Sequence, residues 1–280
     1  MNALIHAREL FSLKGKVRLI DARWGENPQD HYRERHLEGA LYADLESELS
    51  HIREDLSQGG RHPLPSPAEF ARVLGRLGID PDTHVVVYDD RSGAAAAARF
   101  WWMLRGAGHV KVQVLDGGLK AALRLGFPAA SGTEAAPDMT PYPLDRWQLP
   151  IADMDEVGRL AAGSGCVVDV REAERYRGET EPYDLVAGHI PGAINIPYMQ
   201  NLGEDGHFLP AMQLRSLYGD LFSGHSIHQI AVHCGSGVTA CHTLLAMEVA
   251  GLGIPALYPG SYSEWSRNQK PINTSSSGNR

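Results

Sequence analysis

One cysteine in this 280-residue sequence stands where a nucleophile could be held. Residues 230–239, Ile-Ala-Val-His-Cys-Gly-Ser-Gly-Val-Thr, are typical of a short apolar strand, then Cys234, a glycine-rich turn and the start of a helix. Gly235 and Gly237 allow a tight turn, and a turn onto a helix N-terminus points backbone N–H groups inward. These groups and the helix dipole favour negative charge on sulfur. The pattern predicts that Cys234 is a reactive thiol, able to carry a persulfide.

The other two cysteines have ordinary structural explanations. Cys166 precedes two valines in an apolar strand, and Cys241 lies on the helix two turns beyond Cys234. Small buried thiols are common at such places. An odd number of cysteines argues against a disulfide framework, and the first residues lack the basic start and long apolar stretch of a signal peptide. We therefore expect a reducing, cytoplasmic location.

Charge and composition limit the partners. The chain has 26 basic and 34 acidic residues, a net charge of −8, which argues against nucleic acid or an anionic membrane as a partner. Apolar residues make up 43%, enough for a real core, and no run approaches the roughly 18 residues of a membrane span. An anionic small molecule would therefore need a local positive site.

The sequence repeats itself. Segments separated by 143 to 153 residues match in the same order: 17–23 with 166–171, 36–42 with 189–195, 84–90 with 229–235, and 115–122 with 258–265. This near-constant offset indicates a duplicated domain. We place one copy at 5–130 and the other at 145–275, with the proline-rich stretch 128–143 as an extended linker.

Each half alternates short apolar runs with helix-like stretches. We expect strands at 85–88 and 230–233, each followed by a helix, at 93–105 and 238–250. This alternation predicts an α/β fold in which each domain has a mostly parallel sheet with helices on both faces. Ligands of such sheets sit beyond the carboxyl ends of the strands. There the first half has Asp89 or Asp90 in place of the thiol, so we expect that half to be catalytically silent.

These motifs together resemble the tandem-domain sulfurtransferases of the rhodanese family, over roughly residues 5–272. The resemblance rests on the loop 234–239, on Gly-His-Ile-Pro-Gly-Ala at 188–193, on Asp-Val-Arg at 169–171, and on His-Leu-Glu-Gly-Ala at 36–40. It implies an enzyme without a cofactor or metal, with its active site in the second domain at the domain interface. Cys234 would take a sulfane sulfur from a donor as a persulfide and pass it to cyanide, a thiol or thioredoxin.

The resemblance also implies a substrate site. It assigns substrate contacts to Gly235, Gly237, Val238 and Thr239, and matches Arg175 to the family's carboxylate-binding arginine. An arginine fork suits a carboxylate because it binds both oxygens. Thiosulfate enzymes of the family usually carry a basic pair after the cysteine. The neutral loop here resembles that of the mercaptopyruvate enzymes, so 3-mercaptopyruvate is the favoured donor and thiosulfate the alternative.

A proton relay is implied as well. Mercaptopyruvate enzymes use a serine, a histidine and an acid, which match Ser236, His62, and either Glu46 or Asp44 in this sequence. The spacing between the acid and the histidine is longer here than is usual in the family. His62 is equally consistent with an ordinary loop histidine.

The sequence departs from the family at one of the two positions that bind the donor's carboxylate. Mercaptopyruvate enzymes usually have a second arginine just after a Glu-Pro pair, whereas this chain has Tyr183 there. Arg177 is the replacement that the sequence suggests. The alternative for Arg175 itself is a surface ion pair with Glu172 or Glu174.

Three other functions bear on this sequence. A phosphatase of related fold needs an arginine six positions after its cysteine, and residue 240 is alanine. Histidines and cysteines crowd residues 225–242, but their spacing does not fit structural zinc. A persulfide carrier or interaction module without efficient turnover remains the non-enzyme alternative, because a fold alone does not fix a function.

Overall fold

The computed structural model describes residues 1–136 and 139–274 and divides into two compact units. The first unit comprises 1–51, 65–149 and 203–208, and the second comprises 52–64, 150–202 and the chain from 209 onward. Residue 275, the expected end of the second domain, lies outside the described residues. Among those described, no helix is long and apolar enough to cross a membrane.

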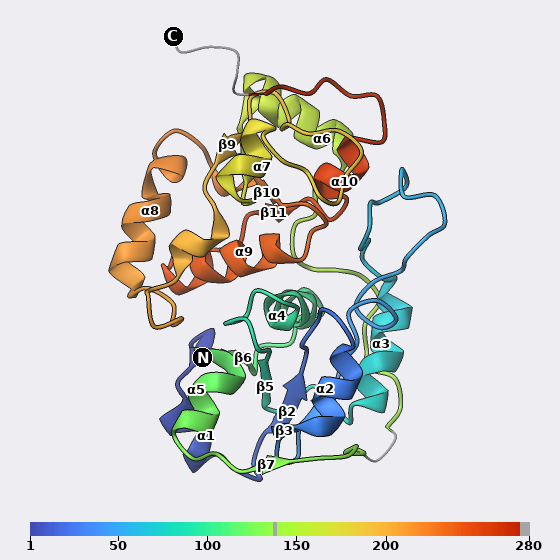
Figure 1. Cartoon of the computed structure of the whole chain (residues 1–280), viewed down its shortest axis with the longest axis vertical. Coiled ribbons are helices and arrows are strands. Elements are labelled where there is room, and N and C mark those ends of the chain that lie inside the picture. Colours follow the sequence, from blue (N-terminus) through green and yellow to red (C-terminus); the bar gives the residue numbers. More distant parts are fainter. Residues whose placement is uncertain (137–138, 275–280) are drawn as a thin grey trace. The chain divides into compact units, whose positions relative to one another are not determined.

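The first unit is built on a five-stranded parallel sheet with the order β1-β6-β5-β2-β4 (Figure 1). Its strands are β1 (Leu4–Ile5), β2 (Arg18–Asp21), β4 (Leu41–Tyr42), β5 (Val85–Tyr88) and β6 (Val112–Leu115). A separate antiparallel pair joins β3 (His36–Leu37) and β7 (Ala129–Ala130). The helices are α1 (Ala7–Ser12), α2 (Pro28–Glu34), α3 (Pro67–Arg76), α4 (Ala97–Gly106) and α5 (Gly118–Arg124).

The second unit has a four-stranded parallel sheet with the order β11-β10-β8-β9. Its strands are β8 (Cys166–Asp169), β9 (Ile194–Asn195), β10 (Ile230–His233) and β11 (Ala256–Leu257). The helices are α6 (Met154–Arg159), α7 (Ala173–Arg177), α8 (Ala211–Ser223), α9 (Thr239–Val249) and α10 (Ser261–Trp265). Short helical turns lie at Leu160–Ser164, Tyr198–Asn201 and Ile227–Gln229.

Apolar side chains from both faces of each sheet form the core. In the first unit, α1 and α5 share one buried cluster with Leu19, Val86 and Leu115 of the strands, while α4 packs against β5 and β6. In the second unit, α6 and α10 join a cluster with Val167 and Ala231, and α9 packs on β10 and β11. Strand side chains alternate between faces, so each strand needs helices on both sides. This is the α/β arrangement that the sequence predicts.

Both units contain the same buried ion pair after a central strand. Arg23 donates from Nε and Nη2 to Asp21, and Arg171 donates from the same atoms to Asp169. All four side chains are buried, and each guanidinium also donates to backbone carbonyls. Removing one partner of such a pair would leave an uncompensated buried charge. The repeated Asp-x-Arg motif therefore fixes the loop after the strand in each unit.

A second repeated feature joins a histidine to a tyrosine. The His36 ring stacks on Tyr32 at 4.2 Å between centroids, and its Nδ1 lies 2.8 Å from the Tyr32 carbonyl oxygen. His189 stacks on Tyr176 at 3.8 Å, with Nδ1 at 2.7 Å from that carbonyl. Each histidine opens the His-x-x-Gly-Ala segment that repeats in the sequence. The duplication thus extends to side-chain contacts.

Most expected elements form where the pattern places them, with three differences. The strands β5 and β10 have the expected bounds, but α4 begins at residue 97 rather than 93, because the preceding backbone wraps around Asp89. The stretch 128–143 is no free linker, since β7 pairs with β3 and the N–H of Tyr142 donates to the Ala71 carbonyl. The domain boundaries differ as well: residues 52–64, expected in the first domain, belong to the second unit, and residues 145–149 and 203–208, expected in the second domain, belong to the first unit.

Candidate active site

The expected strand, thiol, turn and helix form one continuous structure at Cys234. The residue follows β10 directly, is 2% exposed, and its Sγ accepts a hydrogen bond from the Gly237 N–H at 3.1 Å. Gly237 has φ +76°, and a Cβ there would lie 2.5 Å from the Pro259 carbonyl oxygen. Only glycine fits this position without displacing backbone. The loop then enters α9 at Thr239.

The first residues of α10 form hydrogen bonds with the backbone of this loop. The N–H of Tyr262 donates to the Cys234 carbonyl at 3.1 Å, and the N–H of Ser263 donates to the Gly235 carbonyl at 2.9 Å. Ser261 Oγ accepts from the Cys234 N–H at 3.3 Å. The start of α10 thus fixes the carbonyl groups of Cys234 and Gly235, while the Gly237 N–H donates to the sulfur.

The equivalent loop of the first unit shows what such a turn binds. Asp89 follows β5 as Cys234 follows β10, and its fully buried carboxylate accepts backbone N–H groups at 2.8 to 3.2 Å. The donors are Arg91, Gly93, Ala95, Ala96 and Ala97. Burial raises the pKa of Asp89, while these N–H donors oppose that effect. The first loop therefore surrounds its own side-chain carboxylate, whereas the second presents a thiol.

Ser236 and His62, the expected serine and histidine of the relay, are in contact. His62 Nδ1 lies 2.9 Å from Ser236 Oγ, and both residues are less than 10% exposed. His62 comes from the segment 52–64, which packs within the second unit. A buried imidazole bound to a hydroxyl can move a proton to or from a molecule beside it.

Arg175 faces the loop and is not the surface residue of the alternative explanation. Its side chain is 12% exposed, and Nη2 lies 2.8 Å from Glu181 Oε1 and 3.6 Å from Asp184 Oδ2. Glu172, the partner of the alternative explanation, lies 3.6 Å from Nη1, farther than Glu181. A Cβ built on Gly235 would lie 3.2 Å from Arg175 Nη2. This guanidinium therefore lies directly over the residue that follows the thiol.

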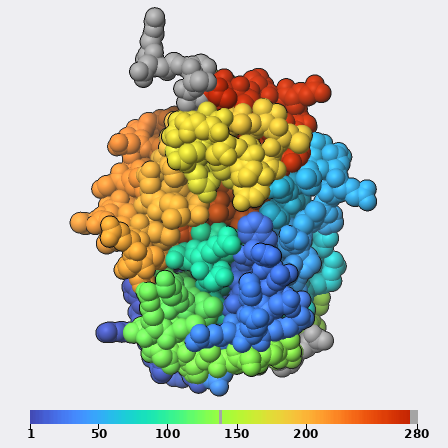
Figure 2. Space-filling view, viewed as in Figure 1, coloured from blue at the N-terminus to red at the C-terminus, as the bar shows by residue number. Residues whose placement is uncertain are grey.

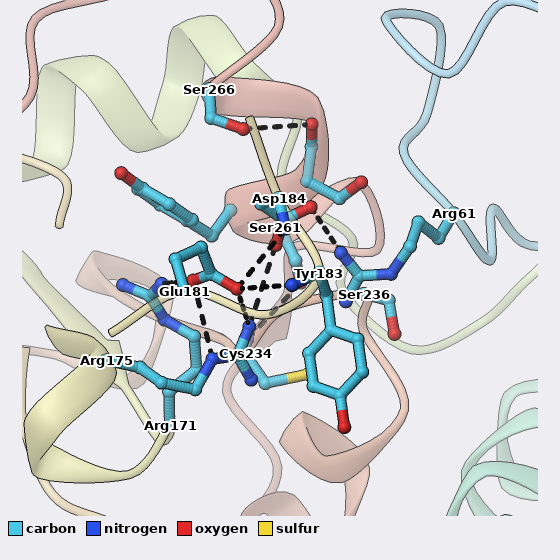
Figure 3. Close-up of polar contacts among 12 residues, drawn as sticks. Arg61, Arg171, Arg175, Glu181, Tyr183, Asp184, Cys234, Ser236, Ser261 and Ser266 are labelled. Atoms are coloured by element: carbon cyan, nitrogen blue, oxygen red, sulfur yellow. Dashed lines mark hydrogen bonds and ion pairs between the residues drawn. The ribbon is translucent and has the colours of Figure 1, made fainter. Parts of the chain in front are cut away.

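Arg61 is a site residue that sequence reasoning missed. Its Nη1 forms an ion pair with the buried carboxylate of Asp184 (Figure 3). Arg267 contacts the same carboxylate at 2.8 Å. A Cβ on Gly235 would lie 2.9 Å from Arg61 Nη2. The available signal was its position immediately before His62, but nothing local in the sequence ties residue 61 to residue 235.

Tyr183 covers these two arginines. Its ring centroid lies 5.5 Å from the Arg61 guanidinium carbon and 5.0 Å from that of Arg175, and the residue is 63% exposed. The surrounding stretch from α7 onward forms part of the surface of the second unit (Figure 2, yellow). Tyrosine cannot bind a carboxylate as arginine does, but its ring holds the guanidinium planes by cation–π contact.

The remaining expected residues have other contacts or other exposure. Val238 is 5% exposed and leads into α9, which begins at Thr239. Arg177 is 40% exposed and pairs with Glu179 at 2.7 Å, so the structure gives no support to it as an anchor. Glu46 is exposed and belongs to the first unit, where its backbone N–H donates to the carboxylate of Asp44, the other candidate acid.

In the described part of the chain, candidate metal ligands gather in the first unit. Among the described residues, one group of side chains could supply three ligand atoms within 4.8 Å of one another, formed by His6, Asp116 and His207 of the first unit. Asp116 Oδ2 lies 3.4 Å from His6 Nδ1 and 3.2 Å from His207 Nδ1, which is within ion-pair range. The crowded histidines and cysteines at 225–242 form no such group in the described part of the chain.

The arrangement can bind an anion and attack it. A buried thiol lies under a backbone N–H, with a Ser–His pair beside it and two guanidinium groups over the next residue. Such a site can hold a carboxylate or another oxyanion in the arginine forks while the sulfur forms a covalent bond.

Comparison with known proteins gives a consistent result. The model of a rhodanese-like domain matches residues 7–124 and 153–268. A probable 3-mercaptopyruvate sulfurtransferase of Pseudomonas aeruginosa is 42% identical over 95% of this chain and 93% of its own length. The thiosulfate sulfurtransferase of Gallus gallus is 36% identical over 91% and 88%. A solved 3-mercaptopyruvate sulfurtransferase from Leishmania major superposes with a TM-score of 0.83 at 29% identity, over 95% of this chain and 74% of that one.

Proposed function

Because this chain belongs to the tandem-domain sulfurtransferases of the rhodanese family, we propose that it transfers a sulfane sulfur from 3-mercaptopyruvate through a persulfide on Cys234. The single observation that carries the proposal is the buried thiol under the Gly237 N–H, next to two arginines. The acceptor is cyanide or a thiol, of which a thioredoxin is one form. The three free, buried cysteines suit a reducing, cytoplasmic setting.

The first half-reaction breaks the carbon–sulfur bond of the donor. The Cys234 thiolate attacks the donor sulfur, a sulfur–sulfur bond forms, and the electron pair of the carbon–sulfur bond leaves as the enolate of pyruvate. The enolate takes up one proton to give pyruvate. Ser236 is the proposed source of that proton, with His62 at 2.9 Å to resupply it.

The second half-reaction returns the enzyme to its first state. An acceptor thiolate or cyanide attacks the outer persulfide sulfur, and the electron pair of the sulfur–sulfur bond returns to Cys234 as thiolate. The Gly237 N–H of the loop favours both the thiolate and the persulfide anion, because each places negative charge at the same point.

Thiosulfate is the second candidate donor, favoured by the two guanidinium groups over Gly235. A dianion gains from such cations even though the loop itself is neutral. Thiosulfate needs no proton for its leaving sulfite, however. The Ser236–His62 pair therefore favours the keto acid.

The decisive test compares kcat/KM for the two donors on the purified enzyme, together with intact-mass spectrometry after each donor. We expect higher kcat/KM with 3-mercaptopyruvate and one added sulfur on Cys234. Cys234→Ser abolishes transfer, while Cys166→Ala and Cys241→Ala keep it. A persulfide on another cysteine, or sulfur uptake without steady-state turnover, as in a carrier module, would contradict the proposal.

A further inference from the structure

We propose that His6, Asp116 and His207 form a binding site for a divalent transition-metal ion, Zn²⁺. Two imidazole nitrogens and one carboxylate oxygen suit such an ion, whereas Mg²⁺ and Ca²⁺ prefer oxygen ligands alone. All three residues belong to the first unit, and none of them has a part in the proposed sulfur transfer. The proposal therefore gives a function to the unit that lacks the reactive thiol.

The first argument is the register of two parallel strands. β1 pairs with β6 so that Ile5 lies opposite Leu115, and both strands end at these residues. His6 and Asp116 come next, and the Asp116 N–H donates to the Ile5 carbonyl at 3.0 Å. The imidazole and the carboxylate thus lie side by side at the carboxyl edge of the sheet, where parallel sheets bind their ligands.

The second argument is the loop that supplies the third ligand. In the segment 203–208, the Gly203 N–H donates to the His207 carbonyl at 2.8 Å, so the backbone closes the loop on itself. A Cβ added at Gly117 would lie 2.7 Å from His207 Cε1 and 3.1 Å from its Nδ1. A side chain at residue 117 would therefore displace the imidazole from its place beside Asp116.

The third argument is the spacing of the donor atoms. Asp116 Oδ2 lies 3.4 Å from His6 Nδ1 and 3.2 Å from His207 Nδ1, and the three atoms lie within 4.8 Å of one another. Ligand atoms held about 2.0–2.1 Å from a tetrahedral Zn²⁺ are roughly 3.3–3.4 Å apart. A charge-assisted N–H···O⁻ hydrogen bond is shorter, about 2.7–2.9 Å. The observed spacing therefore favours ligands around an ion over directly bonded pairs.

The carboxylate of Asp116 is already oriented for this role. Its side chain is 3% exposed, and the Phe208 N–H donates to Oδ1 at 2.9 Å, which leaves Oδ2 toward the two imidazoles. Hydrogen bonds of this kind fix the carboxylates that bind metals. In the sequence repeat, Pro259 stands where the first half has Asp116, so the fold itself does not require a carboxylate here.

The exposure of the two imidazoles gives the ion access and an open position. The side chain of His6 is 71% exposed and that of His207 is 36% exposed, so Zn²⁺ can enter from solvent and keep a water ligand. The ion would join the end of β1 to the segment 203–208. An ion that binds only the folded chain stabilises it, so the expected role is structural.

Titration calorimetry with ZnCl₂ tests the proposal on the metal-free full chain carrying Cys234→Ser, because the reactive thiol would compete for the ion. We expect one Zn²⁺ per chain and a higher Tm in its presence. His207→Gln and His6→Gln in this background should each weaken binding at least about tenfold, since loss of even a group that only orients a ligand costs about 10–100-fold. Either variant decides the question if the other fails to fold.

His31→Gln is the matched control. His31 is exposed on α2 and lies outside the group of three, so its loss should leave the affinity for Zn²⁺ and the rise in Tm unchanged. Absence of Zn²⁺ binding would overturn the inference, as would binding that neither His6→Gln nor His207→Gln weakens. The assay measures no turnover, so its result is separate from that of the proposed sulfur transfer.

Discussion

Ser236 and Cys234 are two positions apart on one loop, yet they have different proposed tasks. The thiol carries sulfur from any donor, whereas the hydroxyl supplies a proton that only one leaving group needs. The Nδ1 of His62 lies close enough to keep that hydroxyl polarised. Donor preference is therefore expected to depend on the serine and histidine more than on the cysteine.

Ser236→Ala separates these tasks. We expect kcat for 3-mercaptopyruvate to fall about 10²-fold, in the range of lost general acid catalysis, and thiosulfate turnover to change by less than about threefold. Steady-state assays with both donors measure the difference. His62→Gln should follow the same pattern, and an equal loss with both donors would remove the relay from the mechanism.

His233 gives a pH prediction at the same scale. The residue is fully buried beside Asp169, and burial lowers the pKa of its imidazole. The unfolded imidazole takes up a proton near pH 6.5, while the folded one stays neutral to lower pH. The stability that His233 contributes is therefore complete above pH 6.5 and decreases as pH falls below it.

Chemical denaturation at pH 7.5 and 5.5 tests whether this contribution to stability decreases as the pH falls. His233→Gln should lose less stability than wild type over that interval, by up to about 1.4 kcal/mol at pH 5.5 if the folded imidazole stays neutral. The comparison between the two proteins cancels the other titrating groups. A variant that loses as much stability as wild type would show that the buried imidazole does not govern this response.

At the scale of elements, the same strand–turn–helix unit appears twice with different contents. The loop after β5 encloses the Asp89 carboxylate with five backbone N–H groups, and the loop after β10 holds a thiol with the Gly237 N–H. The N–H groups of the first loop thus already have an acceptor in the side chain of Asp89. This gives a physical reason for the silence expected of the first half.

Asp89→Ala tests what that carboxylate does for folding. The change leaves several buried N–H groups without an acceptor, and each unsatisfied group costs about 1–3 kcal/mol. We expect a loss of about 3 kcal/mol or more in the free energy of unfolding, measured by urea denaturation. Asp90→Ala is the matched control, because Asp90 is exposed and should change stability little. Similar stability in both variants would contradict the interpretation of this loop.

The elements were predictable because their signals are local. Apolar runs placed β5 and β10, and the glycines beside Cys234 indicated the turn. The late start of α4 was missed because a side-chain carboxylate competes with the helix for the same N–H groups, which periodicity does not show. Arg61 was missed for a related reason: its contact with residue 235 spans the chain and depends on where residues 52–64 pack.

At the scale of the whole molecule, the sequence repeat and the packed units divide the chain differently. Residues 52–64 come from the first half but pack in the second unit, where Gly59 donates to Glu264 and Asn268 donates to the Ser57 carbonyl. This segment carries both Arg61 and His62. A cut between the halves therefore removes part of the proposed active site from the half that contains the thiol.

The isolated fragment 140–280 tests this division. We expect it to lower kcat/KM for 3-mercaptopyruvate by more than about 100-fold, since it lacks His62, the partner of Ser236. The matched control is the full chain with residues 52–64 replaced by a glycine–serine segment of equal length. It should lose a similar factor, because the missing groups are the same. Circular dichroism must first show that each protein is folded. Full activity in a folded fragment would contradict the assignment of His62 to the proton relay. A fully active replacement chain beside an inactive fragment would instead place the requirement elsewhere in the first half.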